Sequence, residues 1–239
     1  MELRWQDAYQ QFSAAENEQQ LFQLIAAYTK RLGFEYCCYG IRVPLPVSKP
    51  AVAIFDTYPE GWMARYQEMS YLDIDSTVRE GARTTNMIVW PDADTADQPR
   101  LWNDAREHGL AVGVAQSSWA ARGVFGLLTI ARHADRLTPA EINMLTLQTN
   151  WLANLSHSLM SRFLVPKLAP EASVTLTQRE REVLCWTGEG KTACEIGQIL
   201  SISERTVNFH VNNILDKLAA TNKVQAVVKA IAMGLIEAP

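Results

Sequence analysis

The chain has 239 residues, long for one domain and comfortable for two, and 48% of them are hydrophobic, enough to bury a core. Charged residues make up 20%, the net charge is −4, and no run of about 18 apolar residues occurs, so we expect no membrane-spanning helix. The acidic, amphipathic start MELRWQDAYQQ is unlike a signal peptide, and the cysteines at 37, 38, 185 and 194 lack CxxC spacing, which argues against disulfides or zinc and favours a reducing cytoplasm.

A first domain with mixed α and β patterns is expected over residues 1–163. Segments rich in aromatic and β-branched residues predict strands, and a short Arg-Gly turn between the last two is typical of a hairpin. Helices before, between and after the strands indicate an α+β fold, an α-β-α sandwich in which helices cover both faces of an antiparallel sheet. The expected helices are 2–14, 17–32, 59–70, 73–83, 100–109 and 138–163, and the expected strands are 36–43, 51–57, 113–120 and 124–132.

A proline-containing segment, LVPKLAPEASVT (164–175), separates this domain from the rest of the chain. Its composition is typical of an interdomain linker, and we expect a second, all-α domain of four helices over 176–239. Three of the T-x-x-E sequences precede apolar helical patterns and predict helix starts, because the Thr hydroxyl accepts a bond from the amide of the Glu while the Glu carboxylate accepts one from the Thr amide. They begin at Thr138, Thr177 and Thr192.

Residues 193–218 have the spacing of a helix-turn-helix. A helix over 193–200 is followed by the three-residue break 201–203, and Ser203 is a good N-cap for the next helix, 204–218. Flanking helices are expected over 178–187 and between Thr221 and Gly234. One face of the third helix carries an apolar stripe that predicts burial, formed by Val207, Val211, Ile214 and Leu218.

The opposite face of this helix carries polar side chains suited to contacting DNA. Arg205, Asn208 and Asn212 can form paired hydrogen bonds with base edges in the major groove. The alternative is a small helical bundle with a solvated polar face. From Thr175 onward there are seven basic and seven acidic residues, so one copy would bind DNA weakly and dimerisation would double its contacts. The candidate phosphate contacts are Lys191, Thr192, Thr206 and His210.

The run LTQREREVLCWTGEGKTACEIGQILSISERTVNFHVNNILDKL resembles the DNA-binding domain of the LuxR family. Glu180, Leu184 and Gly190 stand at positions nearly invariant in that family, and the S-x-x-T-V-N-F-H segment over 203–210 is also similar to it. Over the whole chain the sequence resembles the family's acyl-homoserine-lactone receptors. The resemblance implies a cytoplasmic quorum-sensing transcription factor, not an enzyme, that binds double-stranded DNA.

Residues 55–90 concentrate aromatic side chains together with the carboxylates of Asp73 and Asp75. Tyr and Trp combine an apolar body with a polar group, which suits a pocket for an amphipathic small molecule, and core packing is the alternative explanation. The resemblance favours the pocket, because the family carries W-x3-Y, then D-P, then a Trp and a Gly. The corresponding residues here are Trp62, Tyr66, Asp75, Trp90 and Gly113, and Ser76 replaces the proline.

The resemblance also implies an N-acyl-homoserine lactone as the ligand, with no other cofactor and no metal. Trp62 would donate to the lactone carbonyl, Asp75 would accept the amide N–H, and Tyr58 would donate to the acyl carbonyl. Thr129 would assist from the last strand, and Tyr66 and Trp90 would wall the ring. A medium acyl chain, near octanoyl, would lie among Ile54, Leu72, Ile74, Val78 and Leu127.

The last helix of the first domain carries two apolar stripes, one along 142–163 and one formed by Met144, Leu147, Trp151 and Leu155. One stripe can cover the sheet and the other a partner; a single core stripe with scattered exposed apolar residues is the alternative. The resemblance implies a homodimer on a palindromic promoter element, with RNA polymerase as a further partner. A phosphorylation receiver would need alternating β and α segments, a layout that the first domain lacks. A lactone hydrolase would need clustered histidines or a G-x-S-x-G sequence, and the chain contains neither.

Overall fold

The computed structural model describes residues 5–46, 48–91, 97–120, 123–133, 135–170 and 174–236. These residues form two units, and each is described here by itself. The elements wholly or mostly in the first unit are α1 (Trp5–Ser13), α2 (Glu18–Arg31), β1 (Tyr36–Val43), β2 (Ala51–Asp56), α3 (Trp62–Glu68), the 3-10 turn η1 (Tyr71–Asp73), α4 (Ser76–Gly81), β3 (Ile88–Val89), α5 (Pro99–Glu107), β4 (Val112–Ala120), β5 (Val124–Arg132) and α6 (Pro139–Leu168). Residues Arg42–Val52, Val124 and the end of α6 from Val165 group with the second unit.

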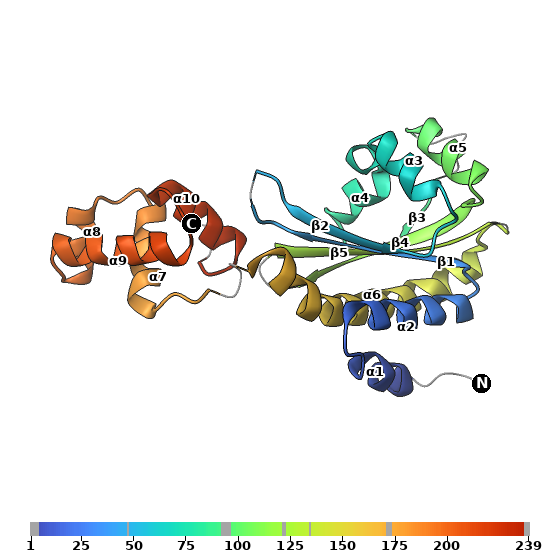
Figure 1. Ribbon diagram of the computed structural model, residues 1–239, viewed down its shortest axis with the longest axis horizontal. Coiled ribbons are helices and arrows are strands. Elements are labelled where there is room, and N and C mark those ends of the chain that lie inside the picture. Colours follow the sequence, from blue (N-terminus) through green and yellow to red (C-terminus); the bar gives the residue numbers. More distant parts are fainter. Residues whose placement is uncertain are drawn as a thin grey trace. The chain divides into compact units, whose positions relative to one another are not determined.

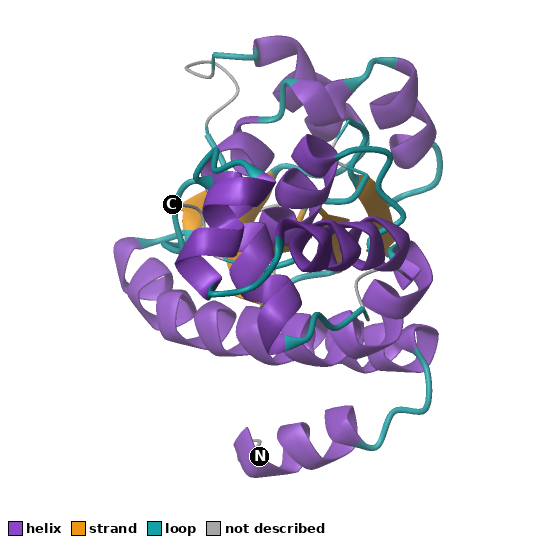
Figure 2. Cartoon of the chain, turned by 90° about the vertical axis from the view of Figure 1, so that its left-hand side faces the viewer, coloured by secondary structure: helices purple, strands orange, loops and turns teal. Residues whose placement is uncertain are grey.

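The five strands form one antiparallel sheet in the order β2-β1-β5-β4-β3. Helices α2 and α6 cover one face, and α3, α4 and α5 cover the other (Figure 1). Figure 2 shows the strands of this unit between the two helical layers. Helix α1 packs outside α2, where the rings of Phe12 and Tyr28 meet edge to face with centroids 6.2 Å apart. The expected sandwich with helices on both faces is therefore confirmed.

Alternation along the strands decides which residues can reach each helical layer. On β1, Tyr39 is buried toward α6, where its hydroxyl shares a 2.8 Å hydrogen bond with Nδ1 of His157. On β5, a Cβ added at Gly126 would lie 2.2 Å from the same Nδ1, so this glycine makes room for the His157 ring. Phe125 and Leu127 point to the other face, toward Gly81 of α4. Alternate residues of β1 and β5 therefore face α3, α4 and α5.

Between β2 and β4, the structure corrects the expected element boundaries. The expected helix 59–70 begins only at Trp62, after Gly61 with a left-handed φ of 86°. The expected helix 73–83 is divided, because Asp75 caps α4 and the preceding residues form the separate turn η1. Strand β3 was not predicted, since two residues are too short to show a period.

The long helix α6 continues to Leu168, beyond the expected end at Phe163, so the first residues of the expected linker are helical. Pro166 removes a single helical hydrogen bond near the end of the helix, and Leu164 stays buried, which outweighs that loss. Residues 2–4, 121–122 and 171–173, which belong to the expected first helix, the hairpin turn and the linker, lie outside the described residues.

The two stripes of α6 have different environments. Leu145, Leu152 and Leu159 of the first stripe are buried in the first unit. In the second stripe, Met144 and Leu147 are 57% and 74% exposed, whereas the ring of Trp151 packs against Tyr28 of α2 with centroids 5.6 Å apart. The N-terminal part of the second stripe is therefore the exposed apolar surface of this helix.

The second unit contains α7 (Gln178–Gly188), α8 (Ala193–Leu200), α9 (Glu204–Lys217) and α10 (Lys223–Ala232), close to the expected bounds. Both capping boxes of this unit form in full at Thr177 and Thr192, and the third T-x-x-E forms the same pair of bonds at Thr138. The predicted stripe of α9, Val207, Val211, Ile214 and Leu218, is buried.

Candidate functional sites: ligand pocket and nucleic-acid interface

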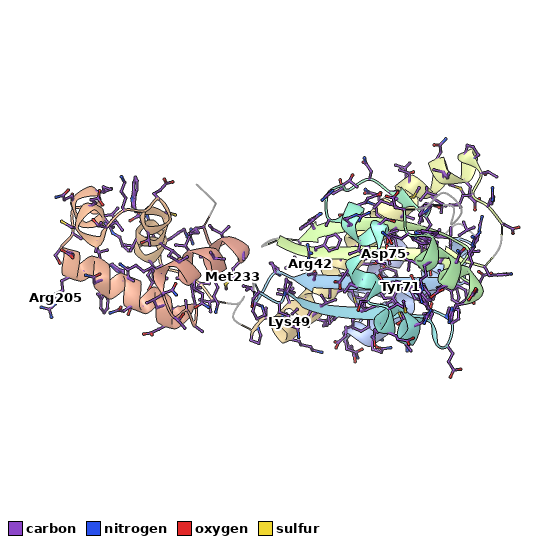
Figure 3. All side chains as sticks on the ribbon, turned by 90° about the horizontal axis from the view of Figure 1, so that it is seen from above. Arg42, Lys49, Tyr71, Asp75, Arg205 and Met233 are labelled. Carbon is purple, nitrogen blue, oxygen red and sulfur yellow. The ribbon has the colours of Figure 1, made fainter. Side chains whose placement is uncertain are left out.

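Asp75 is the polar centre of the first site, above the sheet on the side of α3, α4 and α5. Its Oδ1 accepts hydrogen bonds from the amide and the hydroxyl of Thr77, at 2.8 and 2.7 Å, which makes Asp75 the N-cap of α4. Its Oδ2 accepts a 2.9 Å bond from the Tyr66 hydroxyl. The carboxylate is therefore held firmly although Ser76 stands where the family has proline. Figure 3 shows Asp75 close to Tyr71 in this unit.

Aromatic rings gather beside this carboxylate. Trp62 is 4% exposed and its ring lies 5.7 Å from Tyr66 and 6.2 Å from Tyr71, centroid to centroid. The same apolar cluster includes Tyr58 and Trp90. The structure thus brings together the aromatic residues that the sequence singled out, around the acid that it paired with them.

A second acid, Asp104 on α5, also forms hydrogen bonds with this cluster, and the sequence did not predict it. Its Oδ2 accepts 2.7 Å bonds from the Tyr71 hydroxyl and from Arg65 Nε. The hydrogen bond from Tyr71 and the neighbouring Arg65 charge lower the pKa of Asp104, against the effect of burial. Asp104 is 33 residues from Tyr71 and 39 residues from Arg65 in the sequence, so no local pattern pointed to these bonds.

The thiol of Cys38 is a further group at the pocket that the sequence did not indicate. Cys38 alternates with the buried Cys37 and Tyr39 and therefore faces the other side of the sheet, where its thiol interacts with the Tyr58 hydroxyl. Burial raises the pKa of both Cys38 and Tyr58. Both groups are therefore neutral near pH 7, and Tyr58 keeps a proton that it can donate.

Trp90 lies flat against β4, and Gly113 makes this possible. A Cβ added at Gly113 would be 2.7 Å from Cε2 of the Trp90 ring. The Trp90 and Trp102 rings are 5.1 Å apart, and among the described residues no acceptor reaches either buried indole nitrogen. Buried donors without acceptors are rare in folded proteins, so these two N–H groups are candidates for a bond to a ligand.

The remaining pocket candidates divide between the sheet and the surface. Thr129 is 7% exposed and lies on the same side of β5 as Leu127 and Ala131, which are two residues away on either side, so it faces the aromatic cluster that includes Ala131. Leu72, by contrast, is 40% exposed, so it is a poor wall for an apolar chain. Ile54 is 36% exposed on β2, and Ile74 and Val78 are partly buried beside the apolar clusters.

The second site is the outer surface of α8 and α9. Arg205, Asn208 and Asn212 are all exposed, and Figure 3 shows Arg205 projecting away from the helices. The turn between the helices needs no glycine of its own, because Ser201 adopts the left-handed conformation with φ 54°. Instead Gly197 allows close approach, since a Cβ there would lie 2.8 Å from the Ile202 carbonyl oxygen.

The candidate phosphate contacts differ in how free their side chains are. Lys191 is exposed, and His210 is partly buried. Thr192 is the N-cap of α8 and its hydroxyl also contacts Glu195 Oε2 at 2.7 Å. The Thr206 hydroxyl shares a 2.8 Å bond with Ser203. The two threonines thus have structural roles that the sequence did not separate from contact with DNA.

Glu180, singled out by the family resemblance, is a structural residue at the base of this unit. It is 3% exposed, completes the capping box of α7, and accepts a 2.7 Å bond from Lys217 Nζ on α9. Burial alone would raise the pKa of Glu180, but the hydrogen bonds from Lys217 and Thr177 outweigh it and lower the pKa.

Two family matches cover most of the chain. Residues 17–160 match the family described as "Autoinducer binding domain", and residues 174–230 match "Bacterial regulatory proteins, luxR family". The transcriptional activator protein SolR of Ralstonia solanacearum is 69% identical over 236 residues, covering 99% of this chain and 100% of SolR. The chain belongs to the LuxR family of quorum-sensing regulators.

Solved structures of this LuxR family have the same fold over nearly the whole chain. A crystal structure of Escherichia coli SdiA has a TM-score of 0.85 and 33% identity, covering 97% of both chains. SdiA in complex with octanoyl-rac-glycerol has a TM-score of 0.84 and 33% identity, covering 96% of this chain and 94% of SdiA. The LuxR-family protein thus combines an autoinducer-binding domain with a DNA-binding helix-turn-helix domain.

The helices of this LuxR-family protein that the structure describes include none with the length and apolar character needed to cross a membrane. Within the same described residues, no group of three or more His, Cys, Asp or Glu side chains is arranged to hold a metal ion.

Proposed function

We propose that this protein is a transcription activator that is switched on by an N-acyl-homoserine lactone. The observation that carries the proposal is the divided bonding of Asp75, whose Oδ1 is used by α4 while Oδ2 faces Tyr66. A carboxylate oxygen can accept more than one hydrogen bond, so Oδ2 can take a ligand amide N–H as well. The relatives named activators support the direction of regulation.

The groups around Asp75 complement the polar end of such a ligand. Tyr58 is neutral and donates to the acyl carbonyl, and Trp62 donates its indole N–H to the lactone carbonyl. Tyr66 and Trp90 enclose the ring, with Thr129 on the neighbouring strand. The unpaired N–H groups of Trp90 and Trp102 supply further donors. This set of donors around one acceptor fits an amide flanked by carbonyls, as a homoserine lactone is.

The acyl chain belongs over the sheet, along the apolar side chains that follow the polar centre. A Cβ at Gly40, on the same side of β1 as Cys38, would meet no atom within 4 Å, so there is room at this point. Leu127 and Val78 lie in the apolar cluster beside α4. We propose a medium chain, near octanoyl, and the octanoyl ligand in the related SdiA structure supports this length.

The DNA-bound form is proposed to be a homodimer on a palindromic promoter element, where it works with RNA polymerase. Residues 175–239 carry seven basic and seven acidic residues, which leaves one copy with little attraction for phosphates. Two copies of α9 would address half-sites about one helical turn apart, with Arg205, Asn208 and Asn212 toward base edges. Met144 and Leu147 on α6 offer an exposed apolar surface for the second copy.

The test is purification with and without a panel of acyl-homoserine lactones of graded length, measuring melting temperature and binding to palindromic DNA. We expect the largest stabilisation near octanoyl, and at 100 times its dissociation constant a ligand adds about 2.7 kcal/mol to the folded state. A protein that no lactone stabilises contradicts the proposed ligand. Lactone-dependent stabilisation without DNA binding contradicts the proposed output.

A further inference from the structure

Phe209 is an exposed aromatic residue on the outward face of α9. Its side chain is 60% exposed, although apolar residues elsewhere on this helix are buried. With about 100° of rotation per residue, Phe209 lies about 170° from the mean direction of the four buried residues of the stripe. By the same reckoning Arg205 lies about 150° and Asn208 about 90° away. Phe209 therefore points away from the core more directly than the polar candidates do.

The core of the second unit does not explain this position. The buried stripe of α9 is complete without Phe209. The Phe209 ring meets the ring of the adjacent His210, with centroids 5.7 Å apart. The exposed part of the Phe209 ring contributes no burial energy to folding. The ring lies about 40° around the helix from Arg205, beside the polar candidates for DNA contact, where it can meet an apolar group on DNA.

We infer that Phe209 contacts the C5-methyl group of a thymine in the major groove and so selects thymine within each half-site. This rests on the proposed function, in which α9 enters that groove. Thymine carries the only methyl group that the common bases expose there, and apolar side chains recognise it by contact. Phe209 is about 6 Å along the helix from Arg205, in the N-terminal half that approaches base edges.

The neighbouring residues favour DNA over a protein as the partner of this ring. Arg205 and Asn212 flank Phe209 on the same face, and both can form paired hydrogen bonds with bases. Ile199 on α8, 44% exposed, is the comparable apolar residue of the helix-turn-helix, and it is not on α9. It supplies a matched control, an exposed apolar side chain whose removal should leave base selection unchanged.

The experiment starts from an operator selected from random DNA by the full chain with its lactone. Each thymine is then replaced by deoxyuridine, which removes only the methyl group. We expect one replacement in each half-site to weaken binding by the full chain about threefold to tenfold. Phe209→Ala should bind the thymine and deoxyuridine forms of that site equally, whereas Ile199→Ala should keep the preference. The exposed position predicts an unchanged melting temperature for Phe209→Ala.

Two results would overturn the inference while leaving the proposed function intact. One is specific binding by the full chain with no position sensitive to deoxyuridine. The other is a Phe209→Ala variant that keeps the full preference for thymine. If such a variant loses only transcription activation, the partner of Phe209 is a protein. Failure of the full chain to select any operator with any lactone would instead contradict the proposed function itself.

Discussion

At the scale of single residues, Asp75 has two tasks that use different oxygens. Its Oδ1 caps α4 through Thr77, and its Oδ2 bonds with Tyr66 beside the aromatic cluster. Asparagine is nearly as good an N-cap as aspartate, so a substitution to asparagine separates the two tasks. The fold of α4 should survive the change while the charge that a ligand amide would bond is removed.

We therefore expect Asp75→Asn to raise the lactone concentration for half-maximal response about tenfold or more, because a hydrogen bond to a charged group contributes about 1.5–3 kcal/mol. The measurement is a lactone titration followed by DNA binding or a reporter gene. Asp73→Asn is the matched control, since Asp73 is exposed. An unchanged response in Asp75→Asn, or an equal loss in both variants, would show that this carboxylate does not bind the ligand.

Gly126 gives a second prediction at this scale, about packing on the opposite face of the sheet. A methyl group there would meet His157 Nδ1 at 2.2 Å, so Gly126→Ala should destabilise the unliganded chain by about 1–3 kcal/mol. Thermal unfolding without ligand measures this. Gly40→Ala, on a neighbouring strand with no atom within 4 Å of the new Cβ, should change stability little. Equal effects of the two substitutions would contradict the packing argument.

How far single residues could be predicted from the sequence depended on the range of their contacts. Trp62, Tyr66 and Asp75 lie close together in the chain, and the family resemblance, added to their spacing, predicted that they share one site. Cys38 and Asp104 reach the same site from distant segments, so no local spacing revealed them. Phe209 was missed for another reason. It lies between the buried residues Val207 and Val211 in the sequence, and only its angle around the helix distinguishes it from them.

At the scale of elements, the link between α7 and α9 is electrostatic. Lys217 on α9 bonds to Glu180 Oε2 at 2.7 Å, and Glu180 is almost fully buried at the start of α7. The Lys217 side chain is 37% exposed, so water screens part of the attraction. The same carboxylate also accepts the amide of Thr177, which ties the cap of one helix to the end of another.

Lys217→Met should loosen this link, because it leaves a buried carboxylate with fewer donors. We expect a loss of about 1–3 kcal/mol in the second unit, seen as faster hydrogen exchange in α7 and α9. Lys223→Met, an exposed lysine of the same unit, is the control and should leave exchange in these helices unchanged. If α7 and α9 exchange at the original rate in Lys217→Met, the pair does not stabilise the unit.

The direction of the Glu180 pKa shift also sets a pH dependence. The folded-state pKa is lowered from 4.5, so the stabilisation is fully present above about pH 4.5 and is lost as the pH falls through the folded-state pKa. Lys217→Met should have a smaller shift and therefore lose less stability over the same acidic range. Unfolding curves at several pH values below 5 test this sign, and a larger acid loss in the variant would contradict it.

Elements were predicted well where the information is local. The T-x-x-E sequences at Thr138, Thr177 and Thr192 gave the correct helix starts, since the bonds of a capping box span four residues. The end of α6 was wrong, because the helix continues past Pro166, with Leu164 buried about one turn before its end. Strand β3 is defined by its pairing with β4, in which Ile88 lies opposite Ala115. A strand of two residues is too short to give a pattern in the sequence.

At the scale of the whole molecule, the proposed dimer makes the exposed part of α6 the important surface. Leu147→Glu places a charge where we expect the second copy to bury an apolar side chain, and it should keep the lactone-bound protein monomeric. Sedimentation velocity with saturating lactone measures the association state. Thr146→Glu adds the same charge on another side of the helix and should still dimerise. A dimeric Leu147→Glu would exclude this part of α6 from the interface.

The double use of Asp75 has an evolutionary consequence. In the proposed binding mode, Asp75 cannot be exchanged without loss of the helix cap or of the bond to the ligand amide, whereas side chains over the sheet can change size one at a time. Descendants of this protein would therefore keep the amide-bearing head of the signal and diverge in the length of its tail. Specificity for ligands with other acyl chains would arise from substitutions at positions such as Gly40 and Leu127, while α9 stays unchanged.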